Sequence, residues 1–86
     1  MSETVGERIR KTRVKYGMSQ AELARRIHVS LNAMNRIELG DTPDPRASRI
    51  RAIADVLHVS TDYLLGKKTE EEEGLFEPAL PELVEV

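Results

Sequence analysis

The sequence predicts an all-α fold of five short helices in residues 1–66, followed by a mostly irregular acidic tail in residues 67–86. Three features support this prediction. Apolar residues recur at helical spacing along the first part of the chain, hydroxyl side chains stand where they can cap helix N-termini, and glycines follow two of the predicted helices. Aromatic residues make up only 3% of the 86 residues, so the core of this single small domain must be aliphatic.

The first helix is predicted over residues 4–16, with Thr4 or Ser2 as its N-cap and Gly17 as the left-handed residue that ends it. Helical spacing divides its side chains into an apolar face and a basic face. The predicted inward residues are Val5, Ile9, Thr12 and Tyr16, and the outer face, expected to be solvated, carries Arg8, Lys11 and Lys15.

Residues 20–40 are the centre of the predicted fold. Ser19 and Glu22 form a capping box at the start of one helix, and Ser30 caps a second helix in which Met34 and Ile37 are buried. Two helices with so short a connection must cross steeply, as in a helix-turn-helix. The outer face of the second helix, at about residues 30–38, carries Leu31, Asn32, Asn35 and Arg36. These side chains suit the edges of base pairs, so the sequence predicts binding to duplex DNA.

Two histidines occupy equivalent places in the chain. His28 and His58 each follow an aliphatic residue at a predicted helix end and precede Val-Ser. A left-handed residue, usually glycine, is expected there, and histidine tolerates a positive φ. No cysteine and no suitable serine or aspartate accompanies them, so we predict exposed turn histidines. Because no nucleophile–base pair, phosphate loop or metal-ligand set can be assembled, the sequence predicts neither an enzyme nor a cofactor.

A fourth and a fifth helix complete the predicted domain. The fourth runs to about Leu57, with Asp44 as N-cap and Pro45 as its first residue. Ser60 caps the fifth helix, and Gly66 stops it. The predicted inward residues of the fourth helix are Ala47, Ile50, Ile53, Ala54 and Leu57, and the apolar residues of the fifth are Tyr63, Leu64 and Leu65.

The last twenty residues change character. Four consecutive glutamates, 70–73, are followed by apolar residues that Pro78 and Pro81 interrupt. This pattern predicts a flexible tail without a packed element, with Glu82–Val86 forming at most one turn or an extended piece. The alternative is a peptide that docks on a protein partner through Leu75, Phe76, Leu80, Leu83 and Val84.

Charge is distributed unevenly along the chain. The formal net charge is −2, but residues 1–66 hold 11 Lys and Arg against eight Asp and Glu, which gives +3. Residues 67–86 hold two against seven, which gives −5. A mildly basic body is compatible with phosphate, since affinity depends on the local field. The lack of cysteine, of a membrane-spanning apolar run and of an apolar N-terminal signal predicts a soluble, cytoplasmic protein.

Residues 5–65 resemble the phage repressor and Cro family of helix-turn-helix proteins, also called the xenobiotic response element type. The resemblance implies a lambda-repressor-like domain of five helices that recognises DNA, usually as a dimer on a two-fold symmetric operator. The motifs that carry it are Gly6-Glu7-Arg8-Ile9-Arg10, Gly17-Met18-Ser19-Gln20, Glu22-Leu23-Ala24, Val29-Ser30, Ile37-Glu38-Leu39-Gly40, Ile53-Ala54 and Val59-Ser60-Thr61-Asp62-Tyr63-Leu64-Leu65.

The resemblance also implies which residues face the DNA backbone. Gln20, at the start of the first helix of the motif, matches a position that faces a phosphate. Ser30 caps the second helix and is placed to touch phosphate as well. The loop after Gly40 normally lies against phosphates, but here it is about one residue longer and carries acidic residues, which leaves Thr42 and Arg46 for that role.

Base reading and one structural pair are implied in the same way. Leu31, Asn32, Asn35 and Arg36 match the positions that enter the major groove. Arg36 would bind guanine O6 and N7, Asn32 would pair with adenine N6 and N7, and Leu31 would touch a thymine methyl. Arg13 and Glu38 match a partly buried ion pair between the first and third helices.

Two predictions concern partners. A single reading helix makes too few base contacts for a unique site, so we predict a homodimer, with a contact surface supplied by Val59, Tyr63, Leu64 and Leu65. The tail would either extend this interface or compete with phosphate as an electrostatic brake. The alternative function is a protein-interaction module of the same fold, antitoxin-like or regulator-binding, with weak or no DNA binding.

Overall fold

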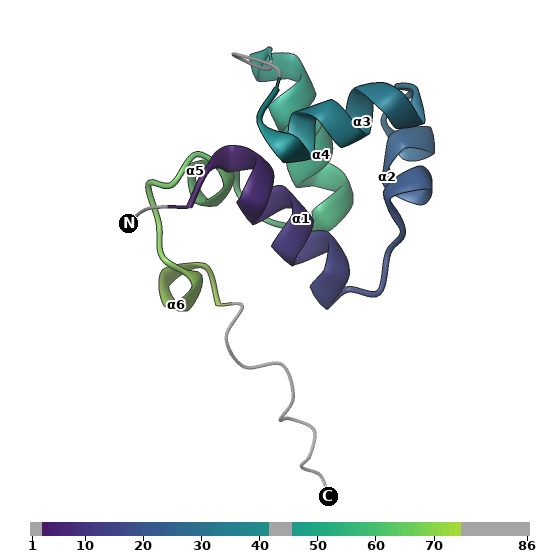
Figure 1. Cartoon of the computed structure of the whole chain (residues 1–86). Helices are drawn as coiled ribbons and strands as arrows, with labels where there is room; N and C mark the ends of the chain where they lie inside the picture. Colours follow the sequence, from purple (N-terminus) through teal and green to yellow (C-terminus); the bar gives the residue numbers. More distant parts are fainter. Residues whose placement is uncertain (1–2, 42–45, 75–86) are drawn as a thin grey trace, which may run out of the picture.

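The computed structural model describes residues 3–41 and 46–74, and the secondary structure in this part of the chain is entirely helical (Figure 1). The helix-turn-helix and the other three predicted helices are present, which confirms the fold class, and one further short helix follows them. The helices are α1 (Val5–Lys15), α2 (Gln20–Arg26), α3 (Leu31–Leu39), α4 (Ala47–Leu57), α5 (Thr61–Leu64) and α6 (Glu70–Glu73).

Local sequence explains where most of these helices begin. The side chains of the N-cap residues of α1, α2, α3 and α5 each accept a hydrogen bond from the backbone N–H three residues on, which satisfies a donor that the helix leaves free. At α1 the bond is reciprocal, because Glu7 also accepts from the Thr4 N–H at 2.9 Å. The four caps are Thr4, Ser19, Ser30 and Ser60.

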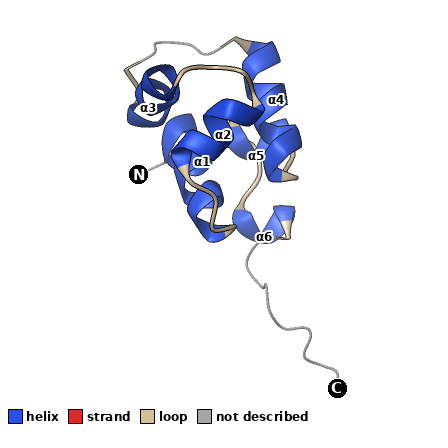
Figure 2. Ribbon diagram, turned by 90° about the vertical axis from the view of Figure 1, so that its right-hand side faces the viewer, coloured by secondary structure: helices blue, strands red, loops and turns tan. Residues whose placement is uncertain are grey.

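One continuous apolar core joins the first five helices, whose arrangement is shown in Figure 2. Helix α1 crosses the domain and contacts α3, α4 and α5, while α2 packs on α3 and α4. Because α3 takes its packing from α1 and α2 on one side only, its opposite side stays exposed. The largest fully buried apolar side chains are Tyr63, Ile9, Leu23, Met34, Ile53, Leu57 and Leu64.

The predicted left-handed turns are confirmed. Gly17 has φ +69°, and His28 and His58 have φ +62° and +58°. Both histidine side chains are exposed. Each histidine lies in the turn that follows a helix, where the backbone adopts a left-handed conformation.

The prediction for the two faces of α1 was wrong at Tyr16 and Arg8. Tyr16 is 48% exposed, because it lies past the last turn of the helix and beyond the core. The Arg8 side chain is only 14% exposed. Its guanidinium lies 4.6 Å above the Tyr63 ring and donates through Nη1 to the carbonyls of Tyr63, at 2.9 Å, and Lys68, at 2.6 Å. Arg8 therefore ties α1 to the chain around and beyond α5.

The start of α4 also differs from the prediction. Helix α4 begins at Ala47, and Arg46 is its N-cap, with an extended backbone (ψ 149°) and no side-chain cap hydrogen bond. The extended Arg46 backbone places the first helical residue two positions later than expected. Ala47 is exposed rather than buried. Asp44 and Pro45 lie outside the described residues.

Residues 67–74 hold a short helix, α6, that was not predicted from the sequence and that polar contacts hold against the domain, with none of its residues buried. Thr69 caps α6 through a capping box with Glu72. The Glu73 carboxylate accepts from the Ser60 N–H and the Ser60 hydroxyl, both at 2.7 Å. Glu70 forms an ion pair with Lys11 of α1. The acidic turn thus fastens the N-terminus of α5 and one face of α1, and the predicted docking residues Leu75, Phe76, Leu80, Leu83 and Val84 lie outside the described residues.

Electrostatics favour the docked form of α6 at neutral pH. The ammonium of Lys11 holds the pKa of Glu70 below its usual value. Burial acts to raise the pKa of Glu73, but the hydrogen bonds from Ser60 and Lys68 outweigh it and leave that pKa lowered. A lowered carboxyl pKa means stabilisation above the unfolded-state pKa that is lost as the pH falls through the folded-state value. Acid should therefore release α6.

Truncation tests the contribution of α6 to stability. A chain that ends at Gly66 should lose roughly 2–3 kcal/mol of unfolding free energy, because Arg8 loses the Lys68 carbonyl and Ser60 loses the Glu73 carboxylate. A chain that ends at Gly74 should keep this stability. Urea denaturation of both chains measures the difference.

Matched point variants separate the contacts from the charge. Glu73→Gln should destabilise the full chain, whereas Glu71→Gln, which removes the same charge from an exposed position, should not. Equal midpoints for the two truncated chains, or for the two variants, would show that α6 adds nothing to the fold.

The predicted dimer surface is wrong for three of its four residues. Val59, Tyr63 and Leu64 are buried in the core of the single chain, because α5 packs between α1 and α4. Only Leu65 remains available, with 47% of its surface exposed. The core of the single domain therefore covers most of the apolar area that was predicted to form the dimer interface.

Candidate nucleic-acid interface

The exposed face of α3 brings together the four predicted base-reading residues. Leu31, Asn32, Asn35 and Arg36 recur at helical spacing and are all exposed. The reverse face of the same helix is fixed in the core by Met34 and Ile37, which are 0% and 3% exposed. The helix is therefore a rigid support with a polar face turned outward and a large apolar side chain, Leu31, at its beginning.

Ser30 sets where this face begins. Its Oγ accepts from the Ala33 N–H at 3.0 Å and starts α3. The residue is exposed, and the bond uses the oxygen as an acceptor, so the hydroxyl proton can still be donated to an anion. The cap and a possible contact with an external oxygen are compatible.

A buried ion pair holds the far end of α3 against α1. Arg13 Nε lies 2.8 Å from Glu38 Oε2, and Arg13 Nη2 lies 3.0 Å from Glu38 Oε1. The two side chains are 11% and 2% exposed. Arg13 Nη1 also donates to the Met18 carbonyl at 2.9 Å. This fork-shaped contact ties together α1, the turn before α2 and the end of α3.

Gln20 has contacts that sequence reasoning missed. Its Nε2 donates to Glu38 Oε1 at 3.1 Å and, over a longer distance of 3.5 Å, to Asn35 Oδ1. The sequence analysis predicted that this side chain faces a phosphate, whereas the structure joins it to α3. The short connection between α2 and α3 predicts that these helices lie close together. It does not show in which direction the Gln20 amide points.

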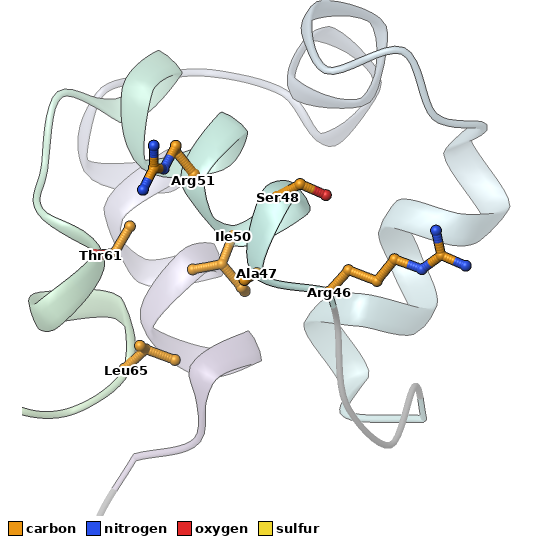
Figure 3. Close-up of a pocket in the computed structure, with 7 residues that line it drawn as sticks. All are labelled: Arg46, Ala47, Ser48, Ile50, Arg51, Thr61 and Leu65. Atoms are coloured by element: carbon orange, nitrogen blue, oxygen red, sulfur yellow. The ribbon is translucent and has the colours of Figure 1, made fainter.

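The remaining predicted backbone contacts are only partly described. Arg46 is exposed at the start of α4. A shallow depression lies between α4 and α5, lined by residues that include Ile50 and Leu65. Figure 3 shows the Arg46 guanidinium pointing away from this depression. Thr42 lies outside the described residues. The structure therefore places Ser30 and Arg46 at exposed positions and leaves Thr42 without a structural account.

The acidic turn lies away from the exposed face of α3. In Figures 1 and 2, α3 lies at the upper end of the molecule and α6 at the lower end, with α1 between them. The Glu70 carboxylate pairs with Lys11, and Glu73 pairs with Lys68 at 3.1 Å. These glutamates neutralise basic groups of the lower end and leave the charge of Arg36 untouched.

The described residues offer neither a metal site nor a membrane-spanning helix. No group of three or more His, Cys, Asp and Glu in this part of the chain could hold a metal ion. Each helix found in the same residues is too short or too polar to cross a bilayer.

Comparisons with known proteins agree with this geometry. The chain is 34% identical over 64 residues to the HTH-type transcriptional regulator ImmR of Bacillus subtilis, covering 74% of this chain and 50% of ImmR. It is 38% identical over 65 residues to the SPbeta prophage-derived HTH-type transcriptional regulator YopO of the same organism, covering 74% of this chain and 90% of YopO. The chain thus spans half the length of ImmR and most of YopO.

A solved structure and a family model give the same result. The P22 c2 repressor protein, solved in complex with synthetic operator 9T, superposes with a TM-score of 0.71 at 34% identity and covers 78% of this chain and all of that one. The model of the helix-turn-helix family matches residues 9–64, a range that contains α2 to α5 and most of α1. The chain therefore belongs to the phage repressor and Cro type of helix-turn-helix family.

Proposed function

We propose that this protein is a transcriptional regulator that binds double-stranded DNA in a sequence-specific manner, acting as a repressor dimer with α3 in the major groove. One observation carries the proposal: a rigid helix, buried on one face, presents Asn32, Asn35 and Arg36 together on its exposed face. An α-helix fits the major groove, and these side chains match the donors and acceptors found there. The names of the relatives and the operator bound to the P22 c2 repressor support it.

Three exposed residues of α3 have a proposed role in reading bases. The Arg36 guanidinium binds guanine O6 and N7, Asn32 pairs with adenine N6 and N7, and Leu31 contacts a thymine methyl. Ser30, Arg46 and Thr42 are the proposed phosphate contacts, which position the protein without reading sequence. Gln20, the fourth predicted phosphate contact, differs from these three because its amide donates to groups within the protein.

The proposed dimer uses the depression between the start of α4 and the end of α5. Figure 3 shows Ala47, Ile50, Thr61 and Leu65 facing this space. Leu65 is the large apolar side chain exposed there, and a second copy related by two-fold symmetry would cover it with its own. To read two half-sites, such a dimer must hold its two reading helices about 34 Å apart, one turn of DNA.

Arg36→Ala tests the proposed base contact. The variant should bind its preferred site about 1–3 kcal/mol more weakly and lose preference at one base pair, with the fold unchanged because Arg36 is exposed. Fluorescence anisotropy on the preferred duplex and on its single-base variants measures both effects. If affinity for the preferred site stays the same while binding to random duplex falls, Arg36 is a phosphate contact.

A salt titration distinguishes this function from the alternative of a protein-interaction module. Binding to random duplex should weaken steeply as salt increases, because phosphate contacts release counterions. Sedimentation should show a dimer at the concentrations where a specific duplex is bound. A chain with no salt-dependent affinity for duplex would favour the protein-interaction module.

A further inference from the structure

The contacts of α6 bring the end of the described chain to the depression between α4 and α5. Glu73, the last residue of α6, accepts hydrogen bonds from the N–H and the hydroxyl of Ser60, both at 2.7 Å. Ser60 directly precedes Thr61, which lines the depression (Figure 3). Gly74 then turns the chain, with φ +83°. Residues 75–86 therefore start next to this depression.

The depression combines an apolar floor with a basic edge. It has a volume of about 720 Å³ and is lined by Ile50 and Leu65, of which Leu65 keeps 47% of its surface exposed. Arg51 also lines it, is exposed, and has no ion pair among the described residues. Within the same part of the chain, the lining contains no acidic residue. Such a surface fits an occupant that is both apolar and acidic.

Residues 75–86 have this composition. Half of these twelve residues are Leu, Phe or Val, three are Glu, and none is Lys or Arg. Twelve residues span up to about 40 Å when extended, so the segment is long enough to cover the depression from its attachment at α6. A tethered segment meets a neighbouring site at an effective concentration of about millimolar. In dilute solution this exceeds the concentration of a second copy.

We propose that residues 75–86 bind in the depression of their own chain, with Phe76 and Leu80 against Leu65 and with glutamates facing Arg51. The segment is then an intramolecular competitor of dimer formation, and this regulatory role rests on the proposed function, because the proposed dimer covers the same Leu65. Both chains must release their tails before they associate. With half of the chains closed, the apparent dissociation constant of the dimer is about fourfold higher.

A spin label tests the docking in the single chain. The sequence has no cysteine, so Ala79→Cys provides one attachment point for a nitroxide. At a concentration where sedimentation shows a monomer, the label should broaden the amide NMR signals of Ala47, Thr61 and Leu65, compared with the same sample after reduction of the nitroxide. No broadening at these residues, or equal broadening over the whole domain, would overturn the inference.

Variants of the labelled chain identify the contacts. Phe76→Ser combined with Leu80→Ser should abolish the broadening, and Arg51→Gln should reduce it. Arg49→Gln is the matched control, because Arg49 is an exposed arginine of α4 that does not line the depression. Equal broadening in the two arginine variants would overturn the contact between Arg51 and the glutamates.

A mixed sample separates the chain's own tail from that of a second copy. Isotope-labelled protein without a nitroxide is mixed with spin-labelled protein without isotopes, so that only contacts between chains broaden signals. The inference predicts no broadening at the depression in the mixture. Broadening confined to the mixture would assign the tail to a second copy and overturn the proposal.

Sedimentation equilibrium tests the competition. The full chain with Phe76→Ser and Leu80→Ser should dimerise with a dissociation constant about fourfold lower than wild type, and circular dichroism verifies that the variant is folded. An unchanged constant would overturn the competition. If wild type and variant both stay monomeric, with or without duplex, the proposed dimer fails, and the spin-label result still decides whether the tail docks.

Discussion

Glu38→Ala is expected to lower the free energy of unfolding by about 3 kcal/mol. The substitution leaves the Arg13 guanidinium, only 11% exposed, without the carboxylate that binds two of its nitrogen atoms. A buried charge without a partner is costly because the interior solvates it poorly. Gln20 would lose its acceptor as well. Urea denaturation followed by circular dichroism measures the change.

The surface ion pairs of α2 provide a control. Glu22 pairs with Arg26 at 2.6 Å, but both side chains are substantially exposed. Glu22→Ala should therefore cost about 1 kcal/mol or less. If Glu38→Ala and Glu22→Ala shift the denaturation midpoint equally, the Arg13–Glu38 pair does not stabilise the fold as its burial implies.

Gly6→Ala is expected to cost about 2–3 kcal/mol. A Cβ at this position would lie 2.5 Å from the carbonyl oxygens of Ile37 and Glu38. These are backbone atoms at the end of α3, so they cannot swing aside as a flexible side chain can. Helix α1 or α3 must shift, which would also disturb the Arg13–Glu38 pair. Thermal and urea unfolding report the loss.

Helix propensity predicts the opposite sign for this substitution. Alanine is about 1 kcal/mol better than glycine inside a helix, so a variant of equal or greater stability would show that α1 and α3 do not approach as closely as described. Arg10→Ala, an exposed change on the same helix, should stay within about 0.5 kcal/mol of wild type.

The local parts of the fold could be predicted from the sequence. Ser19, Ser30 and Ser60 cap helices through contacts within three residues, and Gly17 ends α1 with a positive φ. Such signals need no knowledge of distant partners. This is why the helix-turn-helix and the exposed face of α3 were found by spacing alone.

Long-range contacts could not be predicted in this way. Arg8 bonds to Tyr63 and Lys68, which are 55 and 60 residues away, so its burial has no local signal. The acidic turn α6 is stabilised by contacts with α1 and Ser60 rather than by an apolar stripe of its own. A run of glutamates therefore looked irregular in the sequence, although polar contacts hold it as a helical turn in the structure.

The position of α6 also bears on the prediction that the tail competes with phosphate as an electrostatic brake. Its glutamates pair with Lys11 and Lys68 at the end of the molecule away from α3. This position gives no support to competition between these glutamates and phosphate at the exposed face of α3. It favours a structural role, which the truncations at Gly66 and Gly74 measure directly.

The exposed face of α3 is tested most directly by selecting bound sites from random duplex with the full chain. We expect one enriched sequence with two half-sites related by two-fold symmetry, centred about one turn of DNA apart. The protein should bind this sequence at least about a thousandfold more tightly than random duplex at physiological salt. Equal affinity for the selected and the random duplex would contradict the claim that α3 reads bases.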